Sequence, residues 1–134
     1  MKLIVDANVL IDYGEGTGKR FFREAMRKGY AIHVLENVYA EARFISPSFH
    51  KIKSLISELL KHGIYNRVKA TAEEKVEAAV LKKLCYETLG YDLDRTDRRI
   101  LAIAKNRGFS IVTGDRDMKK LAKKMKLRVF RHFP

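Results

Sequence analysis

The segment Met1-Lys2-Leu3-Ile4-Val5-Asp6-Ala7-Asn8 places a carboxylate directly after an apolar, β-branched run. Such a run is typical of a strand that is buried on both faces, as in parallel sheets. Asp6 then lies at the carboxyl end of this strand. In open α/β sheets, ligands bind at that edge, where the strand order reverses. The segment therefore predicts a parallel sheet with an acidic group at its ligand-binding edge.

Predicted strands and helices alternate along the rest of the chain. Besides residues 3–5, strands are expected at residues 30–35, 64–70, 109–113 and 127–131. Helices are expected at residues 7–13, 19–28, 36–45, 48–62, 71–89 and 97–107, and from Asp115 onward. This alternation predicts a three-layer α/β/α fold with a central parallel sheet of four to five strands and right-handed crossovers. The length of 134 residues fits a single domain, residues 1–134.

The charge balance points to a polyanionic partner. Lys and Arg number 28 against 16 Asp and Glu, so the net charge is +12. Contacts to phosphates would supply affinity for a nucleic acid that does not depend on its sequence. The alternative is a basic surface that is merely solvated. The arginines considered for phosphate contacts, or equally for a solvated face, are Arg95, Arg98, Arg99 and Arg116.

Other features of the sequence favour a cytoplasmic protein. No run of about 18 apolar residues occurs, so no membrane span is expected. The apolar run at the N-terminus ends at Asp6, which is too early for a signal peptide. The single cysteine, Cys85, excludes an intramolecular disulfide framework and a cysteine-rich zinc site.

Two further acids are expected to face inward from helices, and one more to follow a strand. Glu41 shares a helical stripe with Val38, and Asp97 precedes Ile100 by three residues. Asp115 follows the strand at residues 109–113, so it should share the sheet edge with Asp6. The remaining acids considered, Glu58, Glu73, Glu74 and Glu77, fit positions that face solvent.

Each inward acid also has an ordinary structural explanation. Asp97 fits an acid that complements a helix dipole, and Glu41 fits a salt bridge at the border of its stripe. Asp115 and Asp117 fit the cap and first turn of the last helix. Together, however, four neighbouring carboxylates repel one another unless a cation is present.

Oxygen-only ligands select hard ions, so the cluster predicts Mg²⁺ or Mn²⁺. The histidines, at positions 33, 50, 62 and 132, show no close metal-ligand spacing. An acidic metal site inside a basic protein is typical of phosphodiester hydrolysis, in which metal ions activate water and neutralise the leaving oxygen.

Four segments, in order along the chain, resemble the PIN-domain nucleases, especially single-domain VapC-type toxin ribonucleases. They are residues 4–10 (IVDANVL), 38–41 (VYAE), 97–104 (DRRILAIA) and 111–117 (IVTGDRD). The segments span nearly the whole chain. Residues 48–70 contain no matching motif, and two arginines follow Asp97 where small or apolar residues are more usual.

The resemblance implies a Mg²⁺- or Mn²⁺-dependent endoribonuclease in which metal-bound water attacks and leaves 5′-phosphate and 3′-hydroxyl ends. The catalytic, metal-binding acids would be Asp6, Glu41, Asp97 and Asp115. The residues expected to support them are Asn8, Thr113 and Asp117. The resemblance also implies a homodimer and a cognate antitoxin protein that blocks the active groove.

Two alternatives remain open. A haloacid-dehalogenase-like phosphatase also begins with a strand-end Asp, and residues 114–117 are weakly similar to its late acidic motif. Its second acid falls where this chain has Asn8. A catalytically silent RNA-binding or interaction module on the same fold would need the basic charge but not the acids.

Overall fold

The first strand, β1 (Lys2–Val5), lies at the centre of a five-stranded parallel sheet in the computed structural model, which describes residues 1–45 and 47–130. The strand order is β3-β2-β1-β4-β5, and every pairing is parallel. The other strands are β2 (Ala31–Leu35), β3 (Tyr65–Val68), β4 (Ser110–Val112) and β5 (Val129–Phe130). The predicted parallel sheet is therefore confirmed, with five strands.

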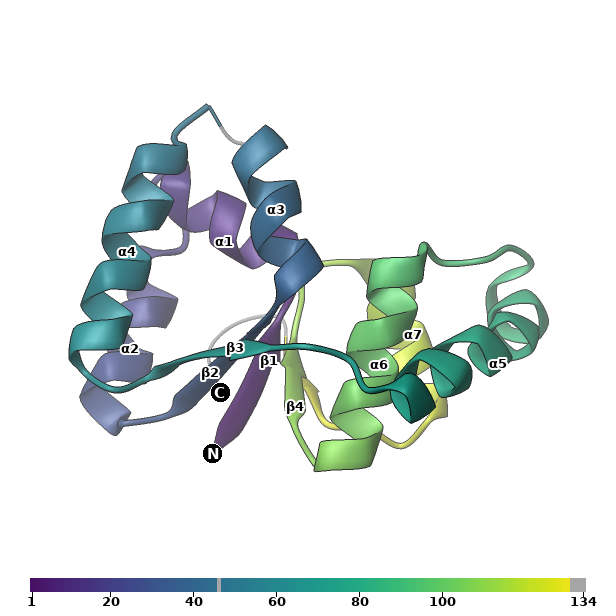
Figure 1. Cartoon of the computed structure of the whole chain (residues 1–134). Helices are drawn as coiled ribbons and strands as arrows, with labels where there is room; N and C mark the ends of the chain where they lie inside the picture. Colours follow the sequence, from purple (N-terminus) through teal and green to yellow (C-terminus); the bar gives the residue numbers. More distant parts are fainter. Residues whose placement is uncertain (46, 131–134) are drawn as a thin grey trace.

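Helices cover both faces of the sheet, as Figure 1 shows: α1 to α4 lie on one side, and α5 to α7 on the other. The first group is α1 (Ala7–Gly14), α2 (Lys19–Lys28), α3 (Glu36–Ile45) and α4 (Phe49–Lys61). The second group is α5 (Ala72–Leu89), α6 (Arg95–Arg107) and α7 (Arg116–Lys124). This arrangement confirms the three-layer α/β/α fold. Strand order reverses at β1, since β2 lies on one side of it and β4 on the other.

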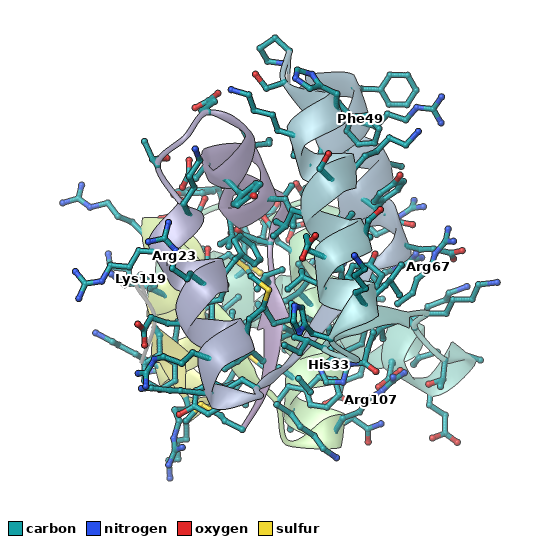
Figure 2. All side chains as sticks on the ribbon, turned by 90° about the vertical axis from the view of Figure 1, so that its left-hand side faces the viewer. Arg23, His33, Phe49, Arg67, Arg107 and Lys119 are labelled. Carbon is teal, nitrogen blue, oxygen red and sulfur yellow. The ribbon has the colours of Figure 1, made fainter. Side chains whose placement is uncertain are left out.

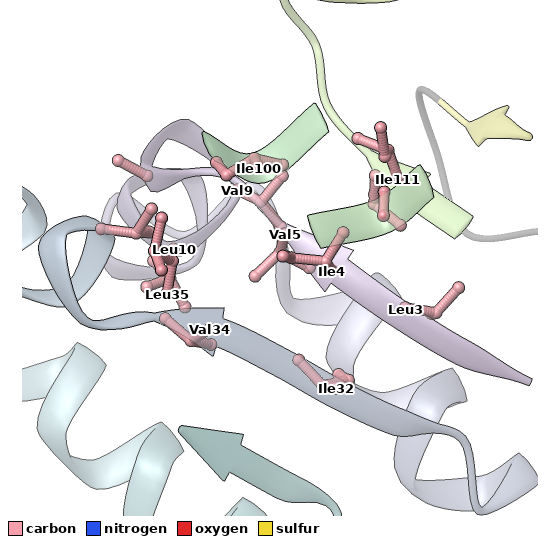
Figure 3. Packing of buried hydrophobic residues seen from close by; sticks show 14 of the residues in the cluster. Leu3, Ile4, Val5, Val9, Leu10, Ile32, Val34, Leu35, Ile100 and Ile111 are labelled. Atoms are coloured by element: carbon pink, nitrogen blue, oxygen red, sulfur yellow. The ribbon is translucent and has the colours of Figure 1, made fainter. Parts of the chain in front are cut away.

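The core is built around β1. Leu3, Ile4 and Val5 are completely buried, because helices pack on both faces of the strand. Figure 3 shows them among apolar side chains of the neighbouring strands, including Val34 and Ile111. Continuous burial explains why β1 has an uninterrupted apolar sequence rather than an alternating one.

Strand register aligns the carboxyl ends of the three central strands. Val5 pairs with Val34 on one side and with Val112 on the other. The next residues of β1 and β4, Asp6 and Thr113, therefore leave the sheet at the same edge. This alignment brings together residues that are 107 positions apart.

A buried ion pair joins the start of α5 to the end of α6. Glu74 is only 1% exposed, and its two carboxylate oxygens accept hydrogen bonds from Arg107 at 2.7 and 2.9 Å. Asn106 and the backbone N–H of Thr71 also donate to Glu74. Chiefly because of Arg107, the pKa of Glu74 falls to about 2. The expectation that Glu74 faces solvent is wrong, because α6 covers its side of α5.

Element boundaries differ from the prediction at a few places. Helix α6 begins at Arg95 rather than Asp97, because the side chain of Asp94 caps it. Helix α4 is one residue shorter than predicted at each end, and β4 is one residue shorter at each end. The predicted last strand is reduced to Val129–Phe130, and residue 131 lies outside the described residues.

In the part of the chain that the structure describes, no helix combines the length and apolar character needed to cross a membrane.

Candidate acidic active site

A pocket lies at the carboxyl edge of the sheet, where β1 and β4 end. The four acids predicted for the site, Asp6, Glu41, Asp97 and Asp115, all line it. Its remaining lining consists of Ala7, Asn8, Val38, Asp94 and Thr96. The acids come from the end of β1, from α3, from the first turn of α6 and from the loop before α7. The fold thus gathers at one place four carboxylates that are distant in sequence.

Asp6 is held from two sides. It is 4% exposed, and the backbone N–H of Val9 donates to its Oδ1 at 3.2 Å, so Asp6 caps α1. The buried hydroxyl of Thr113 donates to the other oxygen, Oδ2. Burial raises the pKa of Asp6, and these two hydrogen bonds partly oppose that rise. The carboxylate is therefore fixed in orientation at the floor of the sheet edge.

Thr113 connects Asp6 to Asp115. Its hydroxyl oxygen accepts a hydrogen bond from the backbone N–H of Asp115 at 3.1 Å while donating to Asp6. Asp115 in turn caps α7, because its Oδ1 accepts from the backbone N–H groups of Asp117 (2.8 Å) and Met118 (2.9 Å). Asp115 therefore caps α7 and lines the pocket at the same time.

Asp97 has the most perturbed carboxyl group of the pocket. Burial is the largest cause, and the negative charges of neighbouring acids add to it, raising the pKa of Asp97 to about 7. In decreasing order, those charges belong to Asp94, Asp6, Asp115 and Glu41. Burial and the charge of Asp94 also raise the pKa of Glu41. The acids are therefore close enough to oppose one another's ionisation.

Asp94 is a fifth carboxylate in the pocket lining, and it is not among the residues predicted for the site. Its Oδ1 accepts a hydrogen bond from the backbone N–H of Asp97 at 2.8 Å, so Asp94 both caps α6 and lines the pocket. The signal that could have revealed it is its position three residues before Asp97. A cap residue and the third residue of its helix are joined by a hydrogen bond, so both lie at the same helix end.

The three residues predicted to support the acids have different surroundings. Thr113 bonds Asp6, and Asn8 lines the pocket from the first turn of α1. Asp117 lies outside the pocket lining, and its Oδ2 accepts a hydrogen bond from the phenol of Tyr91.

Arg98 is buried and cannot act as a surface contact for phosphate, in contrast to what the sequence suggested. Its Nη1 donates to Ala78 O on α5 at 3.0 Å, and its Nε donates to Leu93 O at 3.3 Å. Its Nε also lies 3.3 Å from Asp92 Oδ1. Arg98 therefore ties the loop before α6 to α5. Of the other candidates, Arg95 and Arg116 are exposed and Arg99 is half-buried.

The polar side chains that line the pocket offer oxygen atoms as metal ligands, which suits a hard divalent cation. As they stand, no three His, Cys, Asp or Glu side chains in the described ranges, 1–45 and 47–130, are assembled to hold a metal ion. Several carboxylates are instead bonded to helix N-termini and to Thr113. A metal site built from three or more of these carboxylates would therefore need their side chains to turn toward one another.

Comparison with known proteins identifies the class. The family model described as PIN domain matches residues 3–124, and the chain belongs to the PIN-domain family. PIN domains are generally nucleases, so membership supports a nuclease function. Among curated proteins, none matches this sequence.

Several solved structures share the fold at low sequence identity. VapBC2 from Rickettsia felis, bound to a DNA fragment from its promoter, is 16% identical with a TM-score of 0.71, covering 97% of this chain and 98% of that chain. VapC20 from Mycobacterium tuberculosis, a toxin that cleaves the sarcin–ricin loop, is 11% identical with a TM-score of 0.62, covering 87% and 92%. FitAcB from Neisseria gonorrhoeae is 18% identical with a TM-score of 0.63, covering 96% of each chain.

Proposed function

We propose that this protein is a Mg²⁺- or Mn²⁺-dependent endoribonuclease and the toxin of a toxin–antitoxin pair. The observation that carries the proposal is the pocket itself: five carboxylates line one pocket at the edge of a PIN-domain sheet, and the pKa of Asp97 is raised to about 7. Asp6, Asp94 and Asp115 also cap helices, but capping does not require the carboxylates to share one pocket, where mutual repulsion opposes folding. The clustering of the acids is explained if they bind a cation.

The residues have distinct parts in this proposal. Asp6, Glu41, Asp97 and Asp115 hold the metal, and Asp94 extends the acidic lining. Thr113 and the N–H of Val9 fix the Asp6 carboxylate, while Asn8 contributes a neutral polar group. When bound, a divalent metal supplies activated water and stabilises charge on the leaving oxygen. Exposed arginines outside the pocket neutralise flanking phosphates.

The proposed partners follow from different observations. RNA as substrate is supported by the net charge of +12 and by the similar toxin VapC20, whose described activity is on the sarcin–ricin loop. A cognate antitoxin is supported by the similarity to VapBC2 and FitAcB. A homodimer remains a prediction from the family resemblance, and sedimentation of the purified protein tests it.

Cleavage of RNA by the purified protein tests the function. Asp6→Asn and Asp97→Asn should each lower the rate at least about 100-fold, because substitutions that merely support metal ligands already cost roughly 10- to 100-fold. Glu73→Gln, an exposed acid on α5, is the control and should leave the rate unchanged.

Other outcomes separate the alternatives. Metal-dependent cleavage that survives both substitutions would show that the pocket is not the active site. Salt-sensitive RNA binding without cleavage by the wild type would favour the silent binding module. Hydrolysis of small phosphomonoesters would favour the phosphatase.

Metal binding is tested separately by thermal denaturation. Millimolar Mg²⁺ or Mn²⁺ should raise the Tm of the wild type by roughly 5 °C, because ligand binding to the folded state relieves carboxylate repulsion. Asp97→Asn should reduce this shift, and Glu73→Gln should retain it. An unchanged Tm of the wild type would count against a cation at the pocket.

A further inference from the structure

Tyr91 is an aromatic side chain held in place at its polar end and open to solvent elsewhere. It lies in the loop between α5 and α6, and its phenol donates a hydrogen bond to Asp117 Oδ2 in the first turn of α7. The residue is nevertheless 48% exposed. A ring that is exposed is normally free to change rotamer, whereas this one is tethered across two elements.

The tether places Tyr91 beside the acidic pocket. Asp117 donates its backbone N–H to Asp115 Oδ1, and Asp115 lines the pocket. The pKa of the Tyr91 phenol is raised by the hydrogen bond to Asp117 and by burial, and further by the charges of Asp117 and Asp115. Three residues after Tyr91, the same loop supplies Asp94 to the pocket lining.

An exposed, oriented ring at the border of a phosphate-cleaving pocket suits a nucleic-acid base. Bases stack on aromatic side chains with an affinity gain of about 5- to 100-fold per base. A ring that is already fixed loses little conformational freedom on stacking. Arg95, the first residue of α6, and Arg116, the first residue of α7, are both exposed and can offer phosphate contacts.

We propose that Tyr91 stacks against an unpaired base next to the scissile phosphate and so positions the strand for the cut. The proposal rests on the proposed ribonuclease function and adds a specificity-determining residue to it. A paired base cannot reach the ring, because its faces are covered by its neighbours in the helix. Tyr91 is thereby a specificity-determining residue rather than a member of the acid cluster.

The test measures RNA binding on an Asp97→Asn background, so that the RNA stays intact whether or not the wild type cleaves it. The probe is a single-stranded RNA of roughly 12 nucleotides, within the site sizes of single-strand binders, compared with the same strand in a duplex. Tyr91→Ala should raise the Kd for the single strand about 10-fold, with little change for the duplex.

Three variants separate stacking from a structural role. Tyr91→Phe loses the tether to Asp117 but keeps the ring, so its Kd should stay within about two-fold to three-fold of the background protein. Tyr91→Trp should retain binding. Tyr86→Ala is the matched control, since Tyr86 is 59% exposed on α5, outside the pocket lining, and should leave the Kd unchanged.

A scan with abasic nucleotides gives a readout that a structural role would not move. One abasic position should weaken binding to the Tyr91-containing protein as much as Tyr91→Ala does. The same position should then cost the Tyr91→Ala protein nothing more. Equal Kd values for Tyr91→Ala and its background, equal effects of Phe and Ala, or additive losses in the scan would each overturn the proposal.

Failure of the two proposals can be told apart. If the wild type cleaves RNA but Tyr91→Ala binds normally, the stacking role is wrong and the nuclease stands. If the wild type cleaves nothing but the Tyr91 effect is present, the nuclease is wrong and the single-strand binding stands.

Discussion

Asp97 is a single residue at which the pocket disfavours a negative charge in the folded protein. Its pKa of about 7 lies well above the ordinary 3.8, first because of burial and then because of four neighbouring acids. The folded protein therefore binds a proton at Asp97 more tightly than the unfolded chain does. Stability from this group is present below the ordinary pKa and is lost as the pH rises from about 4 to 7.

We expect the metal-free wild type to lose Tm over that pH range relative to Asp97→Asn. The difference should grow by roughly 5 °C between pH 4 and pH 7, because the amide at position 97 has no charge to repel its neighbours. Thermal denaturation in a chelator across this range measures it. The pKa values of Asp6 and Glu41 are raised by causes other than Asp97. Their contributions to the pH dependence of Tm are therefore present in both proteins and largely cancel in the difference. Parallel curves for the two proteins would contradict the raised pKa.

Among the helices, α6 contributes both its cap residue and a first-turn residue to the pocket lining. Its cap, Asp94, and its third residue, Asp97, both line the pocket. The buried Arg98 holds this helix end through Ala78 O and Leu93 O. The side chain that follows Asp97 in sequence therefore faces away from the pocket and anchors the helix that presents it.

We expect Arg98→Met to lower the free energy of unfolding by about 2–4 kcal/mol, because it leaves Asp92 and two carbonyl groups without their charged partner. The control is Arg95→Met, an exposed residue of the same helix, which should cost less than about 0.5 kcal/mol. Urea denaturation of both variants measures the difference. Equal stability of the two variants would show that the buried contacts contribute nothing.

The molecule as a whole is strongly basic, whereas its pocket is lined by acids. The net charge is +12, and Figure 2 shows labelled basic side chains such as Arg23, Arg67 and Lys119 projecting from different elements. In the proposed ribonuclease, positive charge on the surface would attract RNA generally, whereas the pocket would repel phosphate until a cation is bound. The proposal thus assigns attraction and cleavage to different parts of the molecule.

We expect RNA affinity to fall steeply with salt. With at least three phosphate contacts, the slope of log affinity against log salt should be about −2 for a single strand, or roughly 20-fold between 50 and 200 mM. Arg95→Met and Arg116→Met should each make the slope shallower by about 0.7, whereas the buried Arg98→Met should not. Fluorescence anisotropy with the Asp97→Asn protein measures all four slopes. A flat salt response would contradict phosphate-dominated binding.

Much of this architecture was predictable from local pattern. The apolar run before Asp6, the alternation of strands and helices, and the four acids at strand ends or on inward helical stripes all depend on residues close together in sequence. Strand topology then sends the ends of parallel strands to one edge. The placement of Asp6, Glu41, Asp97 and Asp115 around one pocket follows from these rules.

Which charged residues are buried, and which groups they bond, depends instead on contacts between elements that are distant in sequence. Glu74 and Arg98 have sequence patterns typical of solvent-facing positions, but their partners lie 33 and 20 residues away, on another helix. Asp117 bonds Tyr91 across 26 residues, and the cap Asp94 turns out to line the pocket. A helix's own periodicity identifies its apolar face, but the neighbour that packs there determines whether a charge is compensated. Local residue pattern is therefore enough to predict the acidic strand edge that begins at Met1–Asn8, whereas the packing of α5, α6 and α7 establishes what surrounds it.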